Sequence, residues 1–473
     1  GEKGLWRRRA CDFEKKARAS AGPPFSSLGM ALLHALPPSP CRSRFERLHR
    51  SIWRARYVPY SPSRLACAAA GSDVERDAAP LPTPLRERDA SSTSSSLLVS
   101  EWRAWARDRA KATSEALPAT SDLPSVESLF TEIDWIIEDA VVGQRRGSTD
   151  EPPAPWSIAE IAPRRTKTDD DDDDASAREL VLRESVAGLR ALWNARLDDR
   201  VPLQYLTSTS HWRDLVLVVT PATLIPRPET ERMVDFVADA LRRSPELARA
   251  PWADLGTGSG ALAIAVAREL REVARRDENV FGEDSNDAPV VHAVDVDPAA
   301  IAVATENARR HGCFRDGSTN AFHVGSWFEP LDALGVDRFG GIVSNPPYIP
   351  SADVPHLQPE VVLHEPNLAL DGGEGAGTRC VDVVVAGAAT RLKPGGFLLL
   401  ETNGGTQAEA IARSLREWCV GANAEGSSGV SGGVSRAPNA TDGSSTAEKV
   451  FEDVAVLRDF CGVGRFVSAR RKQ

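Results

Sequence analysis

Asn345, Pro346, Pro347 and Tyr348 form a segment whose composition suits the recognition of a planar NH₂ group. Two consecutive prolines stiffen the backbone and remove two N–H donors, so the carbonyl oxygens there can only accept hydrogen bonds. An NH₂ group that donates to the side-chain oxygen of Asn345 and to the carbonyl of Pro346 would keep its nitrogen lone pair free. This arrangement suits the alkylation of an amide or an exocyclic amine. The alternative is a proline turn that only closes a strand.

A glycine-rich segment, residues 254–260, follows one apolar run and precedes a helical one. Glycine lets the backbone turn sharply and approach a ligand, and the helix N-terminus offers free N–H groups. Asp295 ends the next apolar run, where an acid in a nucleotide-binding sheet accepts the ribose hydroxyl protons. These features alone leave NAD and S-adenosylmethionine equally good as cofactors. The segment that begins at Asn345, after a fourth apolar run, decides for S-adenosylmethionine.

The elements that must position these residues alternate between short β-branched runs and helical runs from about Val201 to the end of the chain. This alternation is typical of an α/β unit with a mainly parallel sheet, whose ligand crevice lies at the carboxyl ends of the strands. A short β-hairpin is expected around residues 211–220. The expected strands are 252–255, 290–294, 321–324, 341–344, 397–401, 451–457 and 465–469.

The preceding part of the chain has helical periodicity in residues 97–142 and 179–197, which predicts a small helical domain over residues 96–200. A polar stretch, 143–175, interrupts it and contains six consecutive aspartates, which cannot pack and therefore predict a solvated, disordered insertion. The α/β domain is expected over 201–473, with flexible insertions at 275–288 and 421–448.

The charge of the chain is unevenly distributed. Residues 1–66 hold 14 Lys and Arg against 4 Asp and Glu, so a chain of net charge −10 carries −20 in the remainder. The basic, Ser-rich and Pro-rich residues 1–95 are expected to be an organelle transit peptide or a disordered basic tail. The acidic remainder disfavours non-specific binding of duplex nucleic acid. The longest apolar runs are far shorter than the roughly 18 residues of a membrane span.

The seven cysteines are scattered and never spaced C-x-x-C. This spacing disfavours both a disulfide framework and a zinc site, and a reducing compartment fits best. We therefore expect no metal in the site.

Three segments together, 254–260, 293–295 and 345–348, resemble the class I S-adenosylmethionine-dependent methyltransferases that modify planar NH₂ groups. Residues 221–231, 326–328, 345–349 and 364–373 are more specifically similar to the HemK/PrmC family. Its members are protein-(glutamine-N5) methyltransferases that act on the Gly-Gly-Gln motif of class I peptide-chain release factors. The resemblance covers about residues 200–470 strongly and 97–200 weakly.

This resemblance implies a Rossmann-like domain with a seven-stranded sheet and an N-terminal α-helical domain that recognises the substrate. It implies that Asn345, Pro346 and Tyr348 act in catalysis and that Asn345, Pro346, Pro347 and Tyr348 bind the glutamine amide. Arg227 and Glu231 are expected either to order a loop over the site or to form an internal salt bridge. The cofactor-binding residues implied are Gly256, Thr257, Gly258, Ser259, Gly260, Asp295, Trp327 and Asn345.

The expected activity is therefore methylation of a release-factor glutamine in a plastid or a mitochondrion, by a monomer that binds neither nucleic acid nor membrane. A glutamine methyltransferase of a ribosomal protein would use the same site. An adenine-N6 DNA methyltransferase shares Asn-Pro-Pro-Tyr but normally needs a basic recognition region. A non-catalytic binding protein of the same fold is disfavoured because the glycine segment, Asp295 and Asn345 are all present.

Overall fold

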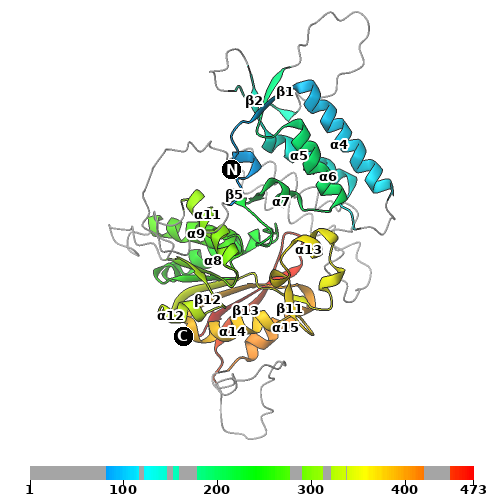
Figure 1. Ribbon diagram of the computed structural model, residues 1–473. Coiled ribbons are helices and arrows are strands. Elements are labelled where there is room, and N and C mark those ends of the chain that lie inside the picture. The colour runs from blue at the N-terminus through cyan, green and yellow to red at the C-terminus, as the bar shows by residue number, and fades with distance from the viewer. Residues whose placement is uncertain are drawn as a thin grey trace, which may run out of the picture. The chain divides into compact units, whose positions relative to one another are not determined.

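The computed structural model describes residues 81–116, 122–145, 153–158, 178–276, 290–312, 321–336, 338–419 and 448–473 (Figure 1). The aspartate run of the expected acidic insertion lies outside these residues, as do most of the insertions expected at 275–288 and 421–448. Within the described ranges, each helix is either too short or too polar to cross a membrane.

A seven-stranded sheet, counted over the described residues, forms the centre of the C-terminal part, in the order β13-β14-β12-β9-β6-β7-β8. Strand β14 runs antiparallel to β12 and β13, and the other pairs are parallel. The chain order reverses between β6 and β9, which makes the carboxyl ends of these strands the expected place for a ligand. The strands are β6 Trp252–Leu255, β7 Val291–Asp295, β8 Phe322–Val324, β9 Phe339–Ser344, β12 Leu392–Glu401, β13 Phe451–Arg458 and β14 Gly464–Arg471.

This topology confirms the expected α/β fold of a class I methyltransferase. Strand β12 begins five residues before its expected start, because Pro394, Gly395 and Gly396 are poor strand formers and hid its first half. The hairpin expected around residues 211–220 is present as β4 Thr209–Trp212 and β5 Leu215–Val218.

Helices cover both faces of the sheet (Figure 1). One apolar cluster joins the first face to α8 Glu231–Arg243, α9 Ala261–Arg276 and α11 Pro298–Arg310. A second cluster joins the other face to α12 Glu329–Ala333, α14 Arg379–Arg391 and α15 Gly405–Glu417. Helix α11 starts where it does because Asp297 accepts a hydrogen bond from the backbone N–H of Ala299 and Pro298 occupies the first turn.

Smaller elements complete this part of the chain. They are α7 Leu203–Thr207, η4 Pro245–Arg249, β10 Ile349–Pro350, η6 Val354–His356, α13 Pro359–His364, η7 Asn367–Ala369 and β11 Asp371–Gly373.

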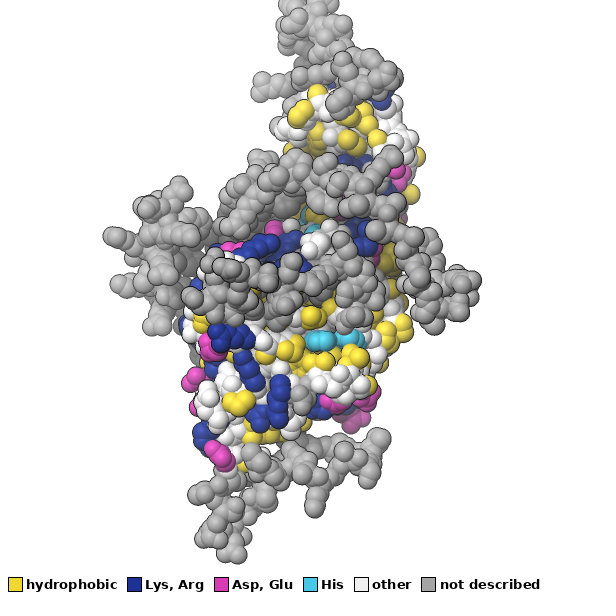
Figure 2. Space-filling model, turned by 90° about the vertical axis from the view of Figure 1, so that its left-hand side faces the viewer, with side chains coloured by type: hydrophobic (Ala, Val, Ile, Leu, Met, Phe, Trp, Pro, Cys, Tyr) yellow, Lys and Arg dark blue, Asp and Glu magenta, His cyan; other side chains and the backbone are white. Residues whose placement is uncertain are grey.

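At the β8 edge of the sheet, His292 and His323 stack with their ring centroids 5.2 Å apart. On the face shown in Figure 2, His side chains are exposed among hydrophobic ones, beside patches of Lys and Arg.

The N-terminal described region has its own apolar core, and it contains strands as well as the expected helices. Residues 179–182 were expected to be helical, but they form β3, which pairs with β1 and β2. A run of three apolar residues fits either periodicity, and pairing with two neighbours decides for the strand. The elements are η2 Leu85–Glu87, β1 Ser92–Ser95, α4 Ser96–Ala116, α5 Val126–Ala140, β2 Val141–Gln144, β3 Glu179–Leu182 and α6 Val186–Asp198.

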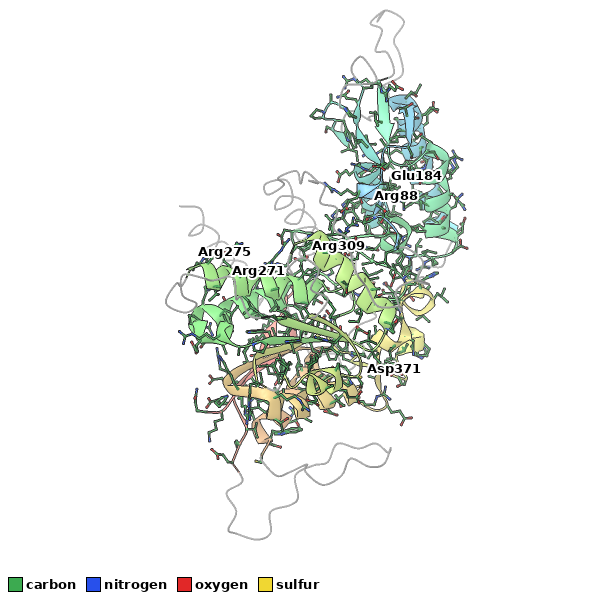
Figure 3. The ribbon with its side chains drawn as sticks, turned by 60° about the vertical axis from the view of Figure 1, so that its left-hand side comes forward. Arg88, Glu184, Arg271, Arg275, Arg309 and Asp371 are labelled. Carbon is green, nitrogen blue, oxygen red and sulfur yellow. The ribbon has the colours of Figure 1, made fainter. Side chains whose placement is uncertain are left out.

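Two expected boundaries differ from the structure. The packed region begins before residue 96, because Leu85 is fully buried and Arg88 lies 3.3 Å from Glu184 (Figure 3). Packing also continues past residue 143, since the indole N–H of Trp156 donates to the Val141 carbonyl at 3.1 Å. Leu85 and Trp156 lie in polar stretches without hydrophobic periodicity, so the sequence pattern did not predict that they are packed. The transit peptide and the division into domains stay predictions.

Candidate active site

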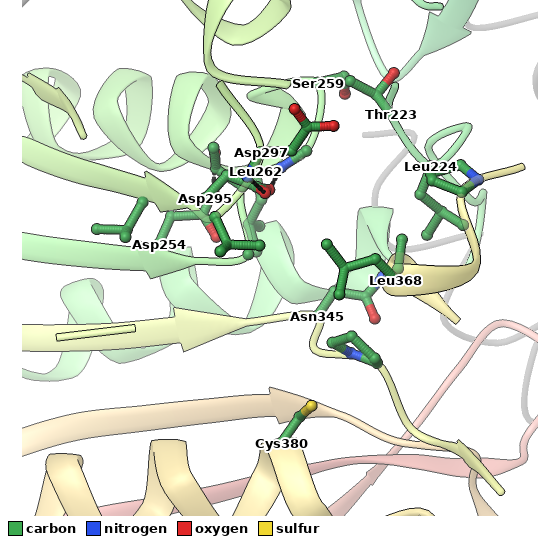
Figure 4. Close-up of a pocket in the computed structure, with 18 of the residues that line it drawn as sticks. Thr223, Leu224, Asp254, Ser259, Leu262, Asp295, Asp297, Asn345, Leu368 and Cys380 are labelled. Carbon is green, nitrogen blue, oxygen red and sulfur yellow. Dashed lines mark hydrogen bonds between the residues drawn. The ribbon is translucent and has the colours of Figure 1, made fainter. Parts of the chain in front are cut away.

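A cavity of about 420 Å³ opens where the carboxyl ends of β6, β7 and β9 meet, and it brings together most of the predicted site residues (Figure 4). Pro346, Tyr348 and Gly260 are not among its lining residues. The predicted residues that line it are Gly256, Thr257, Gly258, Ser259, Asp295, Trp327, Asn345 and Pro347.

The glycine segment connects β6 to α9 and needs glycine at specific positions. Gly256, Gly258 and Gly260 have φ of +75°, +53° and +80°, a region that side chains with a Cβ rarely adopt. At Gly260 an added Cβ would lie only 3.1 Å from the Cα of Ala304 in α11. Gly260 thus lets the segment pack closely on α11, whereas Gly256 and Gly258 border the cavity.

Asp254 supports this segment from beneath. It is 1% exposed, and its Oδ2 accepts a hydrogen bond of 2.7 Å from the Thr257 hydroxyl. Burial raises the pKa of Asp254 to about 7. The cavity therefore has a buried acid in its wall that ionises near neutral pH.

Asn307 of α11 holds the segment on the other side. Its Nδ2 donates to the carbonyls of Val218 and Ser259, both at 2.9 Å, and its Oδ1 accepts from the N–H of Val218 at 2.7 Å. The side chain is fully buried. Asn307 thereby ties the hairpin strand β5 to the glycine segment, a role that sequence spacing did not indicate because its partners lie 48 and 89 residues away.

Asp295 at the end of β7 is oriented by backbone donors. Its Oδ2 accepts from the N–H of Gly258 at 2.9 Å and its Oδ1 from the N–H of Asp297 at 3.1 Å. Burial raises the pKa of Asp295, while the backbone hydrogen bonds lower it. A carboxylate has about four acceptor positions, so Asp295 retains acceptor capacity on the cavity side.

Trp327 follows β8 and lines the cavity with its backbone in the left-handed region, at φ +48°. This conformation costs on the order of 1 kcal/mol for a residue with a Cβ, and such strain concentrates at functional sites. Part of the ring packs on the apolar cluster below, so Trp327 is both a core residue and a wall of the cavity.

Asn345 faces the cavity across from Asp295 (Figure 4). Its Nδ2 donates to the hydroxyl oxygen of Thr230 at 3.3 Å. Because the NH₂ end is engaged there, the side-chain oxygen of Asn345 remains available as an acceptor. This is the polarity that recognition of an NH₂ group requires. Thr230 was not identified from the sequence, although it lies in the segment 221–231 that resembles the family.

Tyr348 points away from the cavity, toward the end of β12. Its hydroxyl donates to Oε1 of Glu401 at 3.4 Å, and its carbonyl accepts from Nε2 of Gln407 at 2.9 Å. Burial raises the pKa of Tyr348 above its usual range. Tyr348 therefore anchors the segment that begins at Asn345.

The rim of the cavity joins two segments that are distant in sequence. Arg227 pairs with Glu365 at 2.6 Å, and Glu365 also accepts from the N–H of Ile225. Arg227 thus forms an ion pair with Glu365 across the rim. Glu231 has a different partner, because its Oε1 accepts a hydrogen bond from the backbone N–H of Arg213 at 3.0 Å.

The cavity wall also contains residues that were not among the predicted site residues, although Leu224 and Leu368 lie in the segments 221–231 and 364–373 that resemble the family. Leu368 is 62% exposed and lines the cavity together with Leu224 (Figure 4). Cys380 and Val383 of α14 line it as well. Among the described residues, His, Cys, Asp and Glu side chains form no group of three or more that could hold a metal ion.

Comparison with known proteins gives consistent relatives. The chain is 37% identical over 294 residues to the release factor glutamine methyltransferase of Synechocystis sp., covering 62% of this chain and 81% of that protein. It is 44% identical over 237 residues to that of Gloeobacter violaceus, covering 49% and 73% respectively. The enzyme of Thermosynechococcus vestitus is 36% identical over 292 residues, covering 62% and 82%. Family models, by contrast, give no match.

Proposed function

Because the chain belongs to the release factor glutamine methyltransferase family, we propose that it methylates the side-chain nitrogen of the glutamine in the Gly-Gly-Gln motif of class I peptide-chain release factors. The chain is a methyltransferase, and its cofactor is S-adenosylmethionine. One observation carries the finer proposal. The amide of Asn345 is turned by Thr230 so that an acceptor oxygen is available at the cavity.

The side chains and backbone around the cavity fit S-adenosylmethionine. The volume of about 420 Å³ is in the usual range for small-molecule sites. Asp295 would accept hydrogen bonds from the ribose hydroxyls, the glycine segment would allow close approach of the backbone, and Trp327 would pack beside the adenine. The bound cofactor supplies an electrophilic methyl group on a sulfonium.

The segment that begins at Asn345 would hold the substrate amide. Asn345 would accept one amide hydrogen, and the carbonyl of Pro346, although Pro346 is not among the lining residues, is proposed to accept the other, so that the nitrogen lone pair faces the methyl donor. Pro347 lines the cavity beside Asn345, and Tyr348 anchors the segment. Transfer would form the N–C bond and break the S–C bond, and the amide nitrogen, made acidic by methylation, would release its proton to water. Catalysis then consists mainly of positioning, and the chain needs no strong base.

The N-terminal region is proposed to recognise the release factor, because the cavity itself is too small to select a protein by more than one side chain. An organellar setting is proposed from the basic, Ser-rich N-terminal segment. The relatives from Synechocystis and Gloeobacter, which are cyanobacteria, favour a plastid over a mitochondrion.

The proposal is tested by incubating the protein with methyl-labelled S-adenosylmethionine and, separately, with an organellar release factor, ribosomes or duplex DNA. We expect label on the release factor alone, at the glutamine of Gly-Gly-Gln by peptide mass spectrometry. A release factor whose motif glutamine is replaced by alanine is the matched control. Label on a ribosomal protein or on adenine, with an unlabelled release factor, would overturn the proposal.

A further inference from the structure

We propose that Gln407 of α15 is a positioning residue that holds the segment from Asn345 to Tyr348 in the geometry that grips the substrate amide. Gln407 is not among the cavity residues and would act on the substrate only through the backbone of this segment. The inference rests on the proposed function, because it assumes that Asn345 and Pro346 hold the target nitrogen.

The side-chain amide of Gln407 joins three backbone segments. Its Nε2 donates to the carbonyl of Tyr348 at 2.9 Å and to the carbonyl of Ala376 at 2.6 Å, and its Oε1 accepts from the N–H of Asn403 at 2.8 Å. The side chain is buried, at 9% exposure. A carbonyl can only accept and a backbone N–H can only donate, so these partners fix which end of the amide is the NH₂.

The acceptor end and the donor end of this amide have different roles. Gln407 is the third residue of α15, and its contact with Asn403 resembles a capping box, in which a Glu or Gln in the first turn reaches back to a backbone N–H at the start of the helix. This contact stabilises the helix. The two donated hydrogens instead fix the carbonyl of Tyr348 against the turn 374–377. Only the donor end is therefore expected to matter for catalysis.

The turn that shares Gln407 with Tyr348 also packs directly on the backbone of Tyr348. A Cβ at Gly377, whose φ is +69°, would lie 2.6 Å from the carbonyl oxygen of Tyr348. A Cβ at Gly372 would lie 2.7 Å from the Cα of Tyr348. Beside these contacts, β10 pairs in parallel with β11. Tyr348 is thus held between the turn on one side and Gln407 on the other.

A displacement at Tyr348 would reach the substrate because the segment is stiff. Proline fixes φ at Pro346 and Pro347, and the residue before each proline is restricted as well. The other end of the segment is fixed where β9 ends, since the hydroxyl of Ser344 donates to the carbonyl of Leu255 at 2.6 Å. The carbonyl of Pro346 lies between these two anchors along the chain, so its direction depends on both.

The test compares Gln407→Glu with the unmodified full chain in release-factor methylation between pH 5.5 and 8.5. A glutamate keeps an acceptor for Asn403 but, when ionised, presents an oxygen instead of a donor to the two carbonyls. At pH 8, kcat is expected to fall about 10-fold or more, as for misplacement of a substrate-positioning group. A protonated glutamate can donate one hydrogen again, so the kcat of Gln407→Glu relative to the unmodified protein is expected to rise as pH falls.

Cofactor binding and two further variants separate positioning from a structural role. The affinity for S-adenosylmethionine is expected to stay within about two-fold in Gln407→Glu, because Asp295 and Gly258 are held by each other and not by Gln407. Gln407→Leu, which offers neither donor nor acceptor, is expected to lose activity at every pH without recovery. Glu409→Gln, at an exposed position of the same helix, is the matched control and is expected to keep both kcat and its pH profile.

Hydrogen–deuterium exchange gives a readout that does not depend on activity. The backbone N–H groups of Ile349 and Ser351 donate to carbonyls within residues 370–373, beside the contact with Gln407. Peptides that cover residues 348–351 are therefore expected to exchange faster at pH 8 in Gln407→Glu than in the unmodified protein or in Glu409→Gln.

Gly377→Ala keeps the inference testable if Gln407→Glu does not fold. The added Cβ would push on the carbonyl of Tyr348 from the side opposite to Gln407. We expect kcat to fall about 10-fold or more, with little change in cofactor affinity. A Gly377→Ala enzyme with the kcat of the unmodified protein would show that the position of this carbonyl does not affect the reaction.

Failure of this inference can be distinguished from failure of the proposed function. A release factor that the unmodified protein leaves unlabelled would overturn the proposed function, and this inference with it. A labelled release factor, together with a Gln407→Glu enzyme that keeps its kcat at pH 8, would overturn only the role of Gln407. A loss of kcat that is equal at pH 5.5 and 8.5 and comes with weaker cofactor binding would do the same, because it would assign Gln407 a structural role alone.

Discussion

At the scale of single residues, two side chains at neighbouring strand ends provide different chemistry to one cavity. Asp295 offers a carboxylate, already held by two backbone N–H groups, and Asn345 offers a neutral amide oxygen. A carboxylate suits hydroxyl donors. A neutral oxygen suits an amide NH₂ donor. A negatively charged oxygen at this position would attract the positive sulfonium and stabilise the ground state too strongly.

Asp295→Ala is expected to weaken binding of S-adenosylmethionine by about 1–3 kcal/mol, the range for loss of charge-assisted hydrogen bonds. Calorimetric titration of the unmodified protein and the variant would measure it. Asp332→Ala is a matched control, because Asp332 forms an exposed ion pair with Arg391 and is not among the cavity residues. Equal affinities in all three proteins would remove Asp295 from the ribose site.

The residues that sequence reasoning placed correctly at the cavity are those that end or follow a strand. Asp295 and Asn345 could be assigned because parallel strands bring their carboxyl ends to one edge of the sheet. Thr230, Glu401 and Asn307 could not be assigned, because each acts on a partner from a distant element and has no motif of its own. Tyr348 belongs to the segment 345–348, yet the direction of its side chain depends on its contact with Glu401 at the end of β12, which lies outside that segment.

At the scale of elements, the glycine segment is held by its neighbours as much as by its own glycines. From the last turn of α11, Asn307 satisfies three backbone groups of β5 and the glycine segment. The hairpin and the helix therefore share one buried anchor.

Asn307→Ala is expected to lower the free energy of unfolding by about 3 kcal/mol, because buried backbone groups would be left without partners at roughly 1–3 kcal/mol each before relaxation. Urea unfolding would measure the change. Thr305→Ala on the same helix is the control, since its hydroxyl bonds only within the helix, to the carbonyl of Ile301. A loss no larger than that of the control would show that water replaces the side chain.

The N-terminal elements give a second prediction at this scale. Deletion of residues 1–80 is expected to leave both methyl transfer and melting temperature unchanged, whereas deletion of residues 1–95 is expected to lower the melting temperature. The longer deletion removes buried Leu85 and strand β1, which pairs with β3. Loss of activity on deletion of residues 1–80 would contradict the proposed transit peptide.

At the scale of the whole molecule, periodicity predicted the sheet region more accurately than the N-terminal region. Strands buried on both faces read as compact apolar runs, as in residues 397–400 of β12, which pairs in parallel with β9. In the N-terminal region, a short run such as Glu179–Leu182 becomes a strand only through its pairing with β1 and β2. Pairing of that kind depends on tertiary structure, which single-sequence patterns do not contain.

Two buried acids, Asp254 and Glu401, each make a contribution to the stability of the fold that depends on pH. Burial raises the pKa of each to about 7. At these two groups the folded chain therefore binds more protons than the unfolded chain between about pH 4 and 7, so the contribution of Asp254 and Glu401 to stability decreases as pH rises through this window.

Asp254→Asn is expected to reduce this decrease, so that the melting temperature changes less between pH 5 and 8 than in the unmodified protein. Asp332→Asn is the control, because hydrogen bonding to Arg391 lowers the pKa of Asp332 and places its titration below this range. A slope that is the same in all three proteins would mean that Asp254 is ionised throughout.

The central claim, that the side-chain oxygen of Asn345 holds the substrate amide, is tested most directly by single-turnover methylation of a release factor with Asn345→Ala. The rate at saturating S-adenosylmethionine is expected to fall about 100-fold or more, as for loss of an oriented hydrogen bond that acts in the transition state. Cofactor affinity is expected to change much less, because the glycine segment and Asp295 remain. An Asn345→Ala enzyme that methylates the release-factor glutamine within a few-fold of the unmodified rate would contradict the account.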